Sequence, residues 1–280
     1  MTFCSQNTTT NLILRPFTIP ILAIALRSIA LGDEPPLITD RPDQTESAFT
    51  VPSRLFQVEA GWGYGERREE GAEVTFQGFP QALLRIGLND RFELRLGVPG
   101  FEIDRTDTAT DKTTTRGLID ATLGFKTVIA EEKGALPQTA FLGTLVVPSG
   151  DEEFSSDRFE PSFRFLFSNT LSPRLSLGYN LGVLWLTEPD EEGNPDTLSV
   201  FDWTVALGIS ANEKLGVFVE AFGLAPIDAE TRTITSFDTG LTYLLTPRLQ
   251  LDASIGAGLS SAAPDWTVGL GISFRFPRST

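Results

Sequence analysis

The chain has 280 residues, a formal net charge of −15 and no histidine. This acidic balance argues against nucleic acid as a partner, because phosphate binding requires a basic face. The absence of histidine removes the commonest general base and the commonest metal ligand, so we predict a protein that is not an enzyme, with no catalytic residues, metal site or cofactor.

Residues 1–32 resemble a secretory signal peptide. Arg15 precedes an apolar run from Pro16 to Leu26, and the small residues Ala30 and Gly32 suit cleavage after Gly32. Cys4, the only cysteine of the chain, lies in this leader, so no internal disulfide can form. The alternative reading is a short amphipathic helix. A signal peptide would send the chain out of the cytoplasm.

Residues 33–54 form a polar, proline-rich stretch that we call the N-terminal segment. Its four prolines disfavour a regular helix or strand. We expect a periplasmic segment, for which two arrangements remain open. It either folds back so that its charged side chains pair inside a barrel mouth, or it is a solvated lead-in.

Residues 55–276 predict about twelve strands in which apolar and polar residues alternate. The clearest is 174–186, where Leu177, Tyr179 and Leu181 alternate with Gly178 and Asn180. A run of about ten such residues between turns is typical of a transmembrane β-strand. The predicted strands are 55–66, 74–88, 91–101, 117–128, 138–147, 159–171, 174–186, 199–211, 214–225, 233–245, 248–258 and 266–276. Only 138–147 alternates too poorly for its faces to be assigned.

The connections between these strands alternate in length. Short links such as Asn89-Asp90, Ser172-Pro173 and Thr246-Pro247 follow even strands, whereas longer acidic stretches such as 104–116, 148–158 and 187–198 mostly follow odd strands. A soluble β-sandwich, the main alternative, has no reason for this alternation. We therefore predict an all-β protein: a closed antiparallel transmembrane β-barrel in the outer membrane, with residues 277–280 as a C-terminal tail.

The run from Ile38 to Ser47, with Val51-Pro52 and Gln57-Val58-Glu59, resembles the opening of a bacterial outer-membrane family. That family is labelled "transporter" or "putative meta-pathway of phenol degradation". The resemblance implies an outer-membrane barrel concerned with small, often aromatic, compounds. Its N-terminal motif is carried here by Asp40, Arg41, Pro42, Asp43, Gln44 and Glu46.

The alternation also predicts which charged side chains line the lumen. Eight acidic and five basic residues fall on the inner face: Glu59, Glu93, Asp120, Glu160, Asp202, Glu220, Asp238 and Asp252, with Arg85, Arg95, Lys126, Arg164 and Arg275. Their balance predicts a mildly cation-favouring wall. The sequence does not decide whether they line an open passage or satisfy one another in a plugged barrel.

The preferred function is therefore a passive channel or porin-like transporter for small-molecule solutes, aromatic compounds included. A structural or adhesive barrel without transport is the first alternative, and an outer-membrane hydrolase is the weakest because such enzymes usually need a histidine. The expected partners are outer-membrane lipid, lipopolysaccharide and the barrel-assembly machinery. The barrel-assembly machinery would recognise the final strand, which ends in aromatic residues.

Overall fold

A computed structural model describes residues 35–69, 71–189, 194–227 and 233–277, so the predicted signal peptide and the last residues of the tail lie outside it. The described residues fall within one unit, Pro35–Thr280. They contain a single short 3-10 helix, η1 (Glu152–Phe154). The strands are β1 (Leu55–Glu69), β2 (Ala72–Phe79), β3 (Ala82–Asn89), β4 (Phe92–Val98), β5 (Phe101–Thr108), β6 (Lys112–Leu118), β7 (Ala121–Ala130), β8 (Gln138–Val147), β9 (Glu160–Ser172), β10 (Leu175–Pro189), β11 (Pro195–Ser210), β12 (Leu215–Pro226), β13 (Ile234–Thr246), β14 (Leu249–Gly258) and β15 (Trp266–Pro277).

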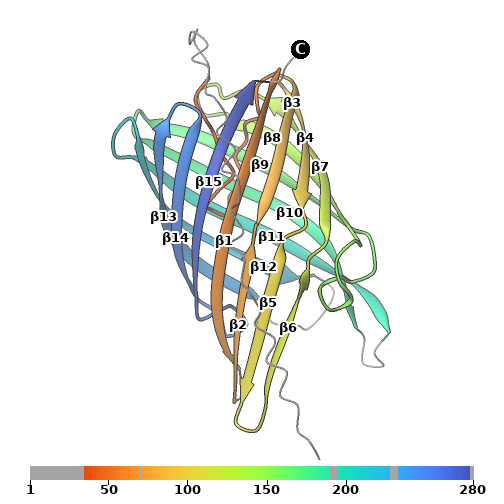
Figure 1. The fold of residues 1–280 in the computed structure, drawn as a ribbon. Helices are drawn as coiled ribbons and strands as arrows, with labels where there is room; N and C mark the ends of the chain where they lie inside the picture. Colours follow the sequence, from red (N-terminus) through yellow and green to blue (C-terminus); the bar gives the residue numbers. More distant parts are fainter. Residues whose placement is uncertain (1–34, 70, 190–193, 228–232, 278–280) are drawn as a thin grey trace, which may run out of the picture. The chain divides into compact units, whose positions relative to one another are not determined.

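These strands form a closed antiparallel barrel (Figure 1). Closure comes from β15, which pairs with β1 from Leu55 opposite Pro277 to Glu66 opposite Trp266. No helix in the described ranges is long and apolar enough to cross a membrane.

Fifteen strand segments make twelve wall strands, because three of the predicted strands are interrupted. The first part of β1 pairs with β3 and its later part pairs with β2, so β2 and β3 are two parts of one strand. In the same way β4 continues into β5 and β6 into β7. Pro80 and Pro99 stand at two of these breaks, where a residue without a backbone N–H interrupts the hydrogen-bond ladder. The prediction of a closed twelve-stranded antiparallel barrel is confirmed.

The two faces of the wall differ as a lipid-embedded barrel requires. Large apolar side chains are exposed on the outer face of nearly every strand, among them Leu96, Leu123, Phe165, Leu181, Val205, Leu241, Leu251 and Leu270. Charged and amide side chains are buried on the inner face, among them Gln57, Glu59, Arg85, Glu93 and Lys126. In a soluble sandwich the apolar side chains would be the buried ones.

The strand whose faces the sequence left unassigned is β8, and its irregular pattern has a local cause. Ala140 and Leu142 of β8 point inward and join Leu166 of β9 and Ala48 of the N-terminal segment in a small buried apolar cluster. Phe141 points outward and stacks among other lipid-facing rings. Because this part of the inner wall packs against an alanine, it is apolar on both faces, and alternation is lost.

The outer connections are more regular than predicted. Residues 104–116, expected to be a loop, mostly continue β5 and β6 as a paired hairpin, and β10 and β11 extend to Pro189 and Pro195. The predicted ends of these strands were wrong, because Thr-rich polar sequence can extend a strand pair beyond the membrane. Residues 148–158 remain a connection that contains η1.

A charged substitution tests the outward face. Leu123 on β7 is 51 % exposed and lies opposite Leu96 in the ladder. We expect Leu123→Arg to lower the free energy of unfolding in lipid vesicles by about 2–4 kcal/mol, because the charge would lie in hydrocarbon. The control is Leu259→Arg, just beyond the end of β14, which should change it by less than about 0.5 kcal/mol. Equal values for the two variants in denaturant titrations would contradict the lipid-facing assignment.

Candidate functional site: the lumen and its N-terminal segment

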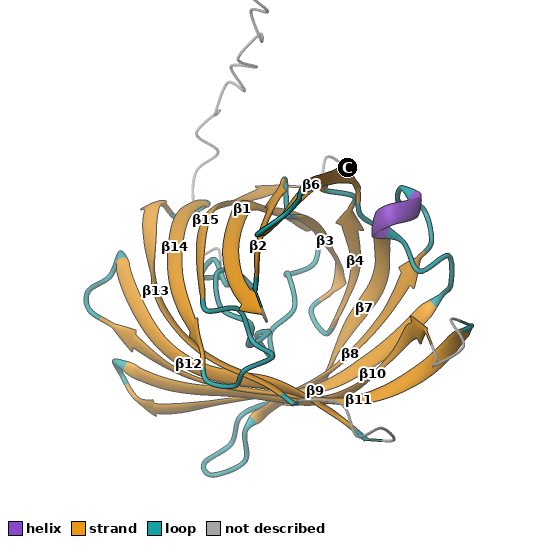
Figure 2. Ribbon diagram, turned by 90° about the horizontal axis from the view of Figure 1, so that it is seen from below, coloured by secondary structure: helices purple, strands orange, loops and turns teal. Residues whose placement is uncertain are grey.

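The N-terminal segment runs into the barrel and back out. Arg275, near the end of β15, donates hydrogen bonds to the carbonyl oxygens of Pro35 and Pro36. At the return, Thr50 and Ser53 bond to Asp90 in the β3–β4 turn, after which β1 begins. Figure 2 shows the intervening coil inside the ring of strands. Of the two arrangements left open by the sequence, these contacts fit the one in which the segment folds back.

Asp40 is the centre of the contacts between segment and wall. Its carboxylate lies 3.0 Å from Arg85, 2.5 Å from Arg95 and 2.9 Å from Lys126, three side chains on neighbouring strands β3, β4 and β7. It also accepts hydrogen bonds from the backbone and hydroxyl of Ser47, which closes the segment into a compact turn. One carboxylate of the segment thus serves three buried cations.

The wall needs the Asp40 carboxylate as a counter-charge, because its strand register places two arginines opposite each other. Arg85 and Arg95 are direct cross-strand partners, and like charges directly opposite one another are destabilising. Glu59 and Glu93 on the wall lie 2.9 Å from Arg85 and supply part of the counter-charge. Glu46 of the segment binds Arg95 with both carboxylate oxygens, at 3.0 and 2.7 Å. The basic side of the lumen is therefore neutralised partly from the wall and partly from the segment.

The deepest part of the segment is also bound on the opposite wall. The backbone N–H of Gln44 donates to Glu220 at 2.7 Å. The Thr45 hydroxyl lies 2.7 Å from that of Thr204 and also donates to Glu220. Asn180 accepts from the N–H of Glu46 and donates to its carbonyl oxygen, which satisfies both backbone groups of that residue. These contacts hold the segment across the bore.

Arg41 lies against two wall glycines. Gly61 and Gly271 are cross-strand partners, and a Cβ on either one would overlap the guanidinium of Arg41. That guanidinium lies 3.4 Å from Asp252 and donates to the carbonyl oxygen of Leu270 at 3.2 Å. The glycines thus give the segment the room it occupies, one use of the abundant glycine in the wall.

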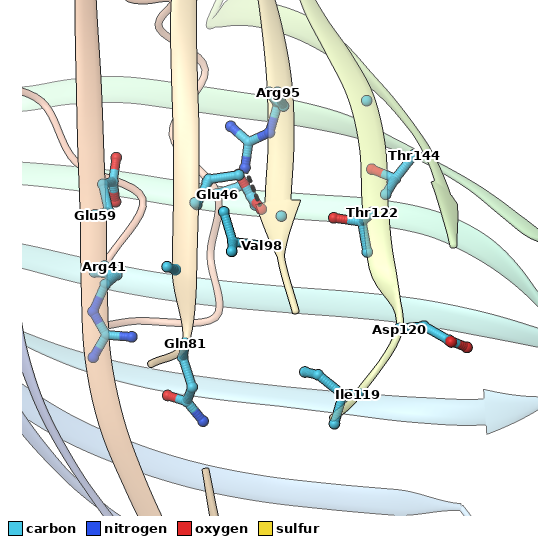
Figure 3. Close-up of a pocket in the computed structure, with 14 residues that line it drawn as sticks. Arg41, Glu46, Glu59, Gln81, Arg95, Val98, Ile119, Asp120, Thr122 and Thr144 are labelled. Atoms are coloured by element: carbon cyan, nitrogen blue, oxygen red, sulfur yellow. Dashed lines mark hydrogen bonds and ion pairs between the residues drawn. The ribbon is translucent and has the colours of Figure 1, made fainter. Parts of the chain in front are cut away.

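Among the cavities lined by described residues, two lie in the lumen beside the segment, and both are lined in part by Arg41 and Gln81. The first, of about 330 Å³, lies next to the broken strands and also borders Glu46, Arg95, Asp120, Thr122 and Thr144 (Figure 3). The second, of about 370 Å³, lies between the segment and β12–β15 and β2. Arg41 and Gln81 thus stand where the two spaces adjoin.

The surroundings of Asp40 and Asp43 in the segment shift the pKa values of these two acids in opposite directions. Burial alone would raise the pKa of Asp40, but Arg85, Lys126 and Arg95 outweigh it and hold the pKa well below its usual value. Burial, together with the nearby Glu220 carboxylate, raises the pKa of Asp43 well above its usual value. Asp40 therefore strengthens attachment at any pH above its folded-state pKa, whereas charged Asp43 weakens it.

Most of the charged residues predicted to line the lumen are buried in the structure. Glu59, Arg85, Glu93, Arg95, Lys126, Asp202, Glu220, Asp238, Asp252 and Arg275 are at most 7 % exposed. The other three are half-buried and lie away from the segment's anchors. Asp120 accepts hydrogen bonds from the 148–155 connection, Glu160 accepts one from Thr187, and Arg164 pairs with Asp202.

Sequence reasoning missed the uncharged members of the site. Gln57, Gln138 and Gln250 donate hydrogen bonds to Ile38, Ala48 and Thr39 of the segment, and Asn180 and Thr204 contact it directly. All five are buried. Four of them fall on an inward position of an alternating strand, a signal that is weaker than a formal charge, whereas Gln138 begins the strand whose faces could not be assigned.

Comparison with known proteins identifies the family. The family model described as "Putative MetA-pathway of phenol degradation" matches residues 39–276. The chain belongs to this family. The match begins within the N-terminal segment, one residue before Asp40, so the segment and the wall that binds it are both part of what the family shares. No curated protein matches the sequence.

Solved structures with the same fold come from outer-membrane proteins. An outer membrane channel from Pseudomonas putida F1 is 14 % identical, with 82 % of this chain and 98 % of that chain covered and a TM-score of 0.63. The translocator domain of the autotransporter NalP from Neisseria meningitidis is 12 % identical, with 81 % and 90 % covered and a TM-score of 0.55. At such identities the likeness establishes the fold alone. These structures share the closed β-barrel fold that the described strands form.

A pH series tests the role assigned to Asp43. In a Cys4→Ser background, Ala48→Cys introduces a thiol where the native side chain is fully buried, so its rate of reaction with dithiodipyridine reports release of the segment. Adding Asp43→Asn should slow labelling at pH 7.5, because it removes a charge that the folded state disfavours. The difference should shrink as the pH falls and vanish below about 3, where Asp43 is protonated in both states.

The matched control is Asp111→Asn in the β5–β6 turn, which makes the same change in net charge on an exposed hairpin. It should leave the labelling rate unchanged at every pH. An Asp43→Asn effect that grows towards low pH would contradict the assigned sign.

Proposed function

We propose that this barrel is a passive outer-membrane channel for small solutes, and that the N-terminal segment controls its bore. The observation that carries the proposal is how the N-terminal segment is attached inside the lumen. The lumen is polar and holds a segment attached largely through ion pairs and hydrogen bonds, with a small apolar cluster at Ala48. A barrel with a purely structural role needs no segment held inside its lumen by exchangeable polar contacts.

The two cavities support a narrow route for solutes. They adjoin at Arg41 and Gln81, whose long side chains can change rotamer without any change in the wall. Arg41 is attached to the wall by one 3.4 Å ion pair and one backbone hydrogen bond, so it is held more weakly than Asp40. We infer that small solutes pass where Arg41 and Gln81 move, and that larger openings require release of Asp40.

Small aromatic compounds are the solutes that we favour. The family's description refers to phenol degradation, and inward-facing rings such as Phe76 and Phe222 border the second cavity. A channel of this kind needs no catalytic group, so we propose that the protein is not an enzyme. Membrane lipid, lipopolysaccharide and the barrel-assembly machinery remain proposed partners.

Planar-bilayer recording tests the channel proposal. Purified, refolded wild-type barrel should give small conductance steps. Asp40→Asn should raise the open-state conductance several-fold, because removing one partner of a buried ion pair costs about 3–5 kcal/mol and loosens the segment. Asp111→Asn, with the same change in net charge outside the lumen, should behave as wild type. If neither wild type nor Asp40→Asn conducts, the barrel is not a channel.

A further inference from the structure

The acidic side of the lumen repeats the arrangement of the basic side, but without a counter-ion. Glu220 on β12 and Asp238 on β13 are direct cross-strand partners, as Arg85 and Arg95 are on the other side. The arginine pair is bridged by Asp40. In the described parts of the chain, neither Glu220 nor Asp238 forms an ion pair with a lysine or arginine. Two like charges placed opposite one another are destabilising unless a shared proton or a cation neutralises one of them.

The segment does not supply that positive charge. It presents the Gln44 backbone N–H and the Thr45 hydroxyl to Glu220, both neutral donors. It also adds Asp43 nearby, whose pKa is raised by burial and by Glu220. The protein therefore gathers acidic groups here without a base, whereas on the basic side the segment brings two carboxylates to balance the bases.

Asp238 borders open space and has one carboxylate oxygen without a hydrogen-bond partner. The residue is only 6 % exposed, yet its Oδ1 is buried without a hydrogen-bond partner. The same residue lines the second lumen cavity, of about 370 Å³, which lies within the range of roughly 300–1,000 Å³ typical of small-molecule sites. A buried carboxylate oxygen without a partner is costly, so a donor from a ligand would be strongly favoured.

The rest of the cavity fits an organic body rather than a bare ion. Phe222 lies beside Ser236 in the ladder and Phe76 lies across Gly65, so both rings line the same space as Asp238. Glu102 adds a second carboxylate to the lining, and the one cation there, Arg41, is already paired with Asp252. The described residues hold no group of three or more His, Cys, Asp or Glu side chains suited to a metal ion.

We propose that this cavity binds a small organic cation, a protonated amine carried on an aromatic or apolar body, with its ammonium group on Asp238. The ammonium supplies the charge missing between Glu220 and Asp238 and donates to Asp238 Oδ1. The apolar body lies against Phe76 and Phe222, whose ring faces also attract cations. This inference rests on the proposed channel function, because it names the class of solute that the lumen selects.

Calorimetric titration of the full-length, detergent-solubilised barrel with three matched probes tests the proposal. Benzylamine, benzyl alcohol and benzoate share one ring and differ in charge. We expect benzylamine to bind at least tenfold more tightly than benzyl alcohol, and benzoate to show no binding. Equal affinity for benzylamine and benzyl alcohol in wild-type protein would overturn the proposal without recourse to any variant.

Two substitutions assign the effect to Asp238. Asp238→Asn should weaken benzylamine binding at least tenfold and leave benzyl alcohol unchanged, whereas Asp238→Glu, which keeps the charge, should retain most of the affinity. Asp111→Asn should bind as wild type. If Asp238→Asn binds benzylamine within twofold of wild type, the site is not at Asp238 and the proposal is wrong.

The titration tests the binding site and the bilayer recordings test the channel, so one proposal can fail while the other holds. Binding does not require conduction, so a barrel that binds benzylamine but never conducts would refute the channel and retain the site. A barrel that conducts but binds benzylamine no better than benzyl alcohol would retain the channel and refute the site.

Discussion

The carboxylate of Asp40 among three buried cations is the interaction on which the rest of the lumen depends. Arg85, Arg95 and Lys126 lie on adjacent strands and are almost inaccessible to solvent. Unpaired cations in such a place would be strongly destabilising, and the wall's own acids, Glu59 and Glu93, meet only part of the demand. The remaining counter-charge comes from a segment that is not part of the wall. The barrel and its N-terminal segment are therefore complementary in charge.

This complementarity makes the segment both firmly placed and releasable. Its attachment is polar along most of its length, and polar attachments can be exchanged for water when the lumen is hydrated, unlike the outer face of the wall, which has only lipid to contact. The glycines beneath Arg41 leave the room that its guanidinium occupies. A polar segment inside a barrel with an apolar outer surface suits a passage that must be closed in one state and open in another.

Much of the fold could be predicted because alternation in a barrel strand reports directly on lipid and lumen. Leu177, Tyr179 and Leu181 are outward for the same reason that Asn180 is buried against the segment. Alternation failed at β8, where Ala140 and Leu142 are apolar but inward because they meet Ala48. It also gave no warning of the strand breaks near Pro80 and Pro99, or of the length of the outer hairpin, since both depend on pairing between strands.

The site was harder to predict than the fold. Charge and the alternation of inward and outward positions together identified Glu59, Arg85, Glu93, Arg95 and Lys126. The sequence could not pair the three bases with Asp40, because 45 to 86 residues separate them from it. The imbalance between the two sides of the lumen also emerges only from register. Glu220 opposite Asp238 looks ordinary in the sequence and unusual only once the strands are paired.

The most direct test of this account asks whether the segment occupies the lumen of the inserted barrel. The hydroxyl oxygens of Thr45 and Thr204 are 2.7 Å apart, so Thr45→Cys with Thr204→Cys, in a Cys4→Ser background, should form a disulfide in intact outer membranes under mild oxidation. Thr45→Cys paired with Thr106→Cys on the outer hairpin should not. Failure of the first pair to cross-link, with rapid labelling of the Thr45→Cys thiol by a membrane-impermeant reagent, would show that the segment lies outside the barrel and would contradict the account.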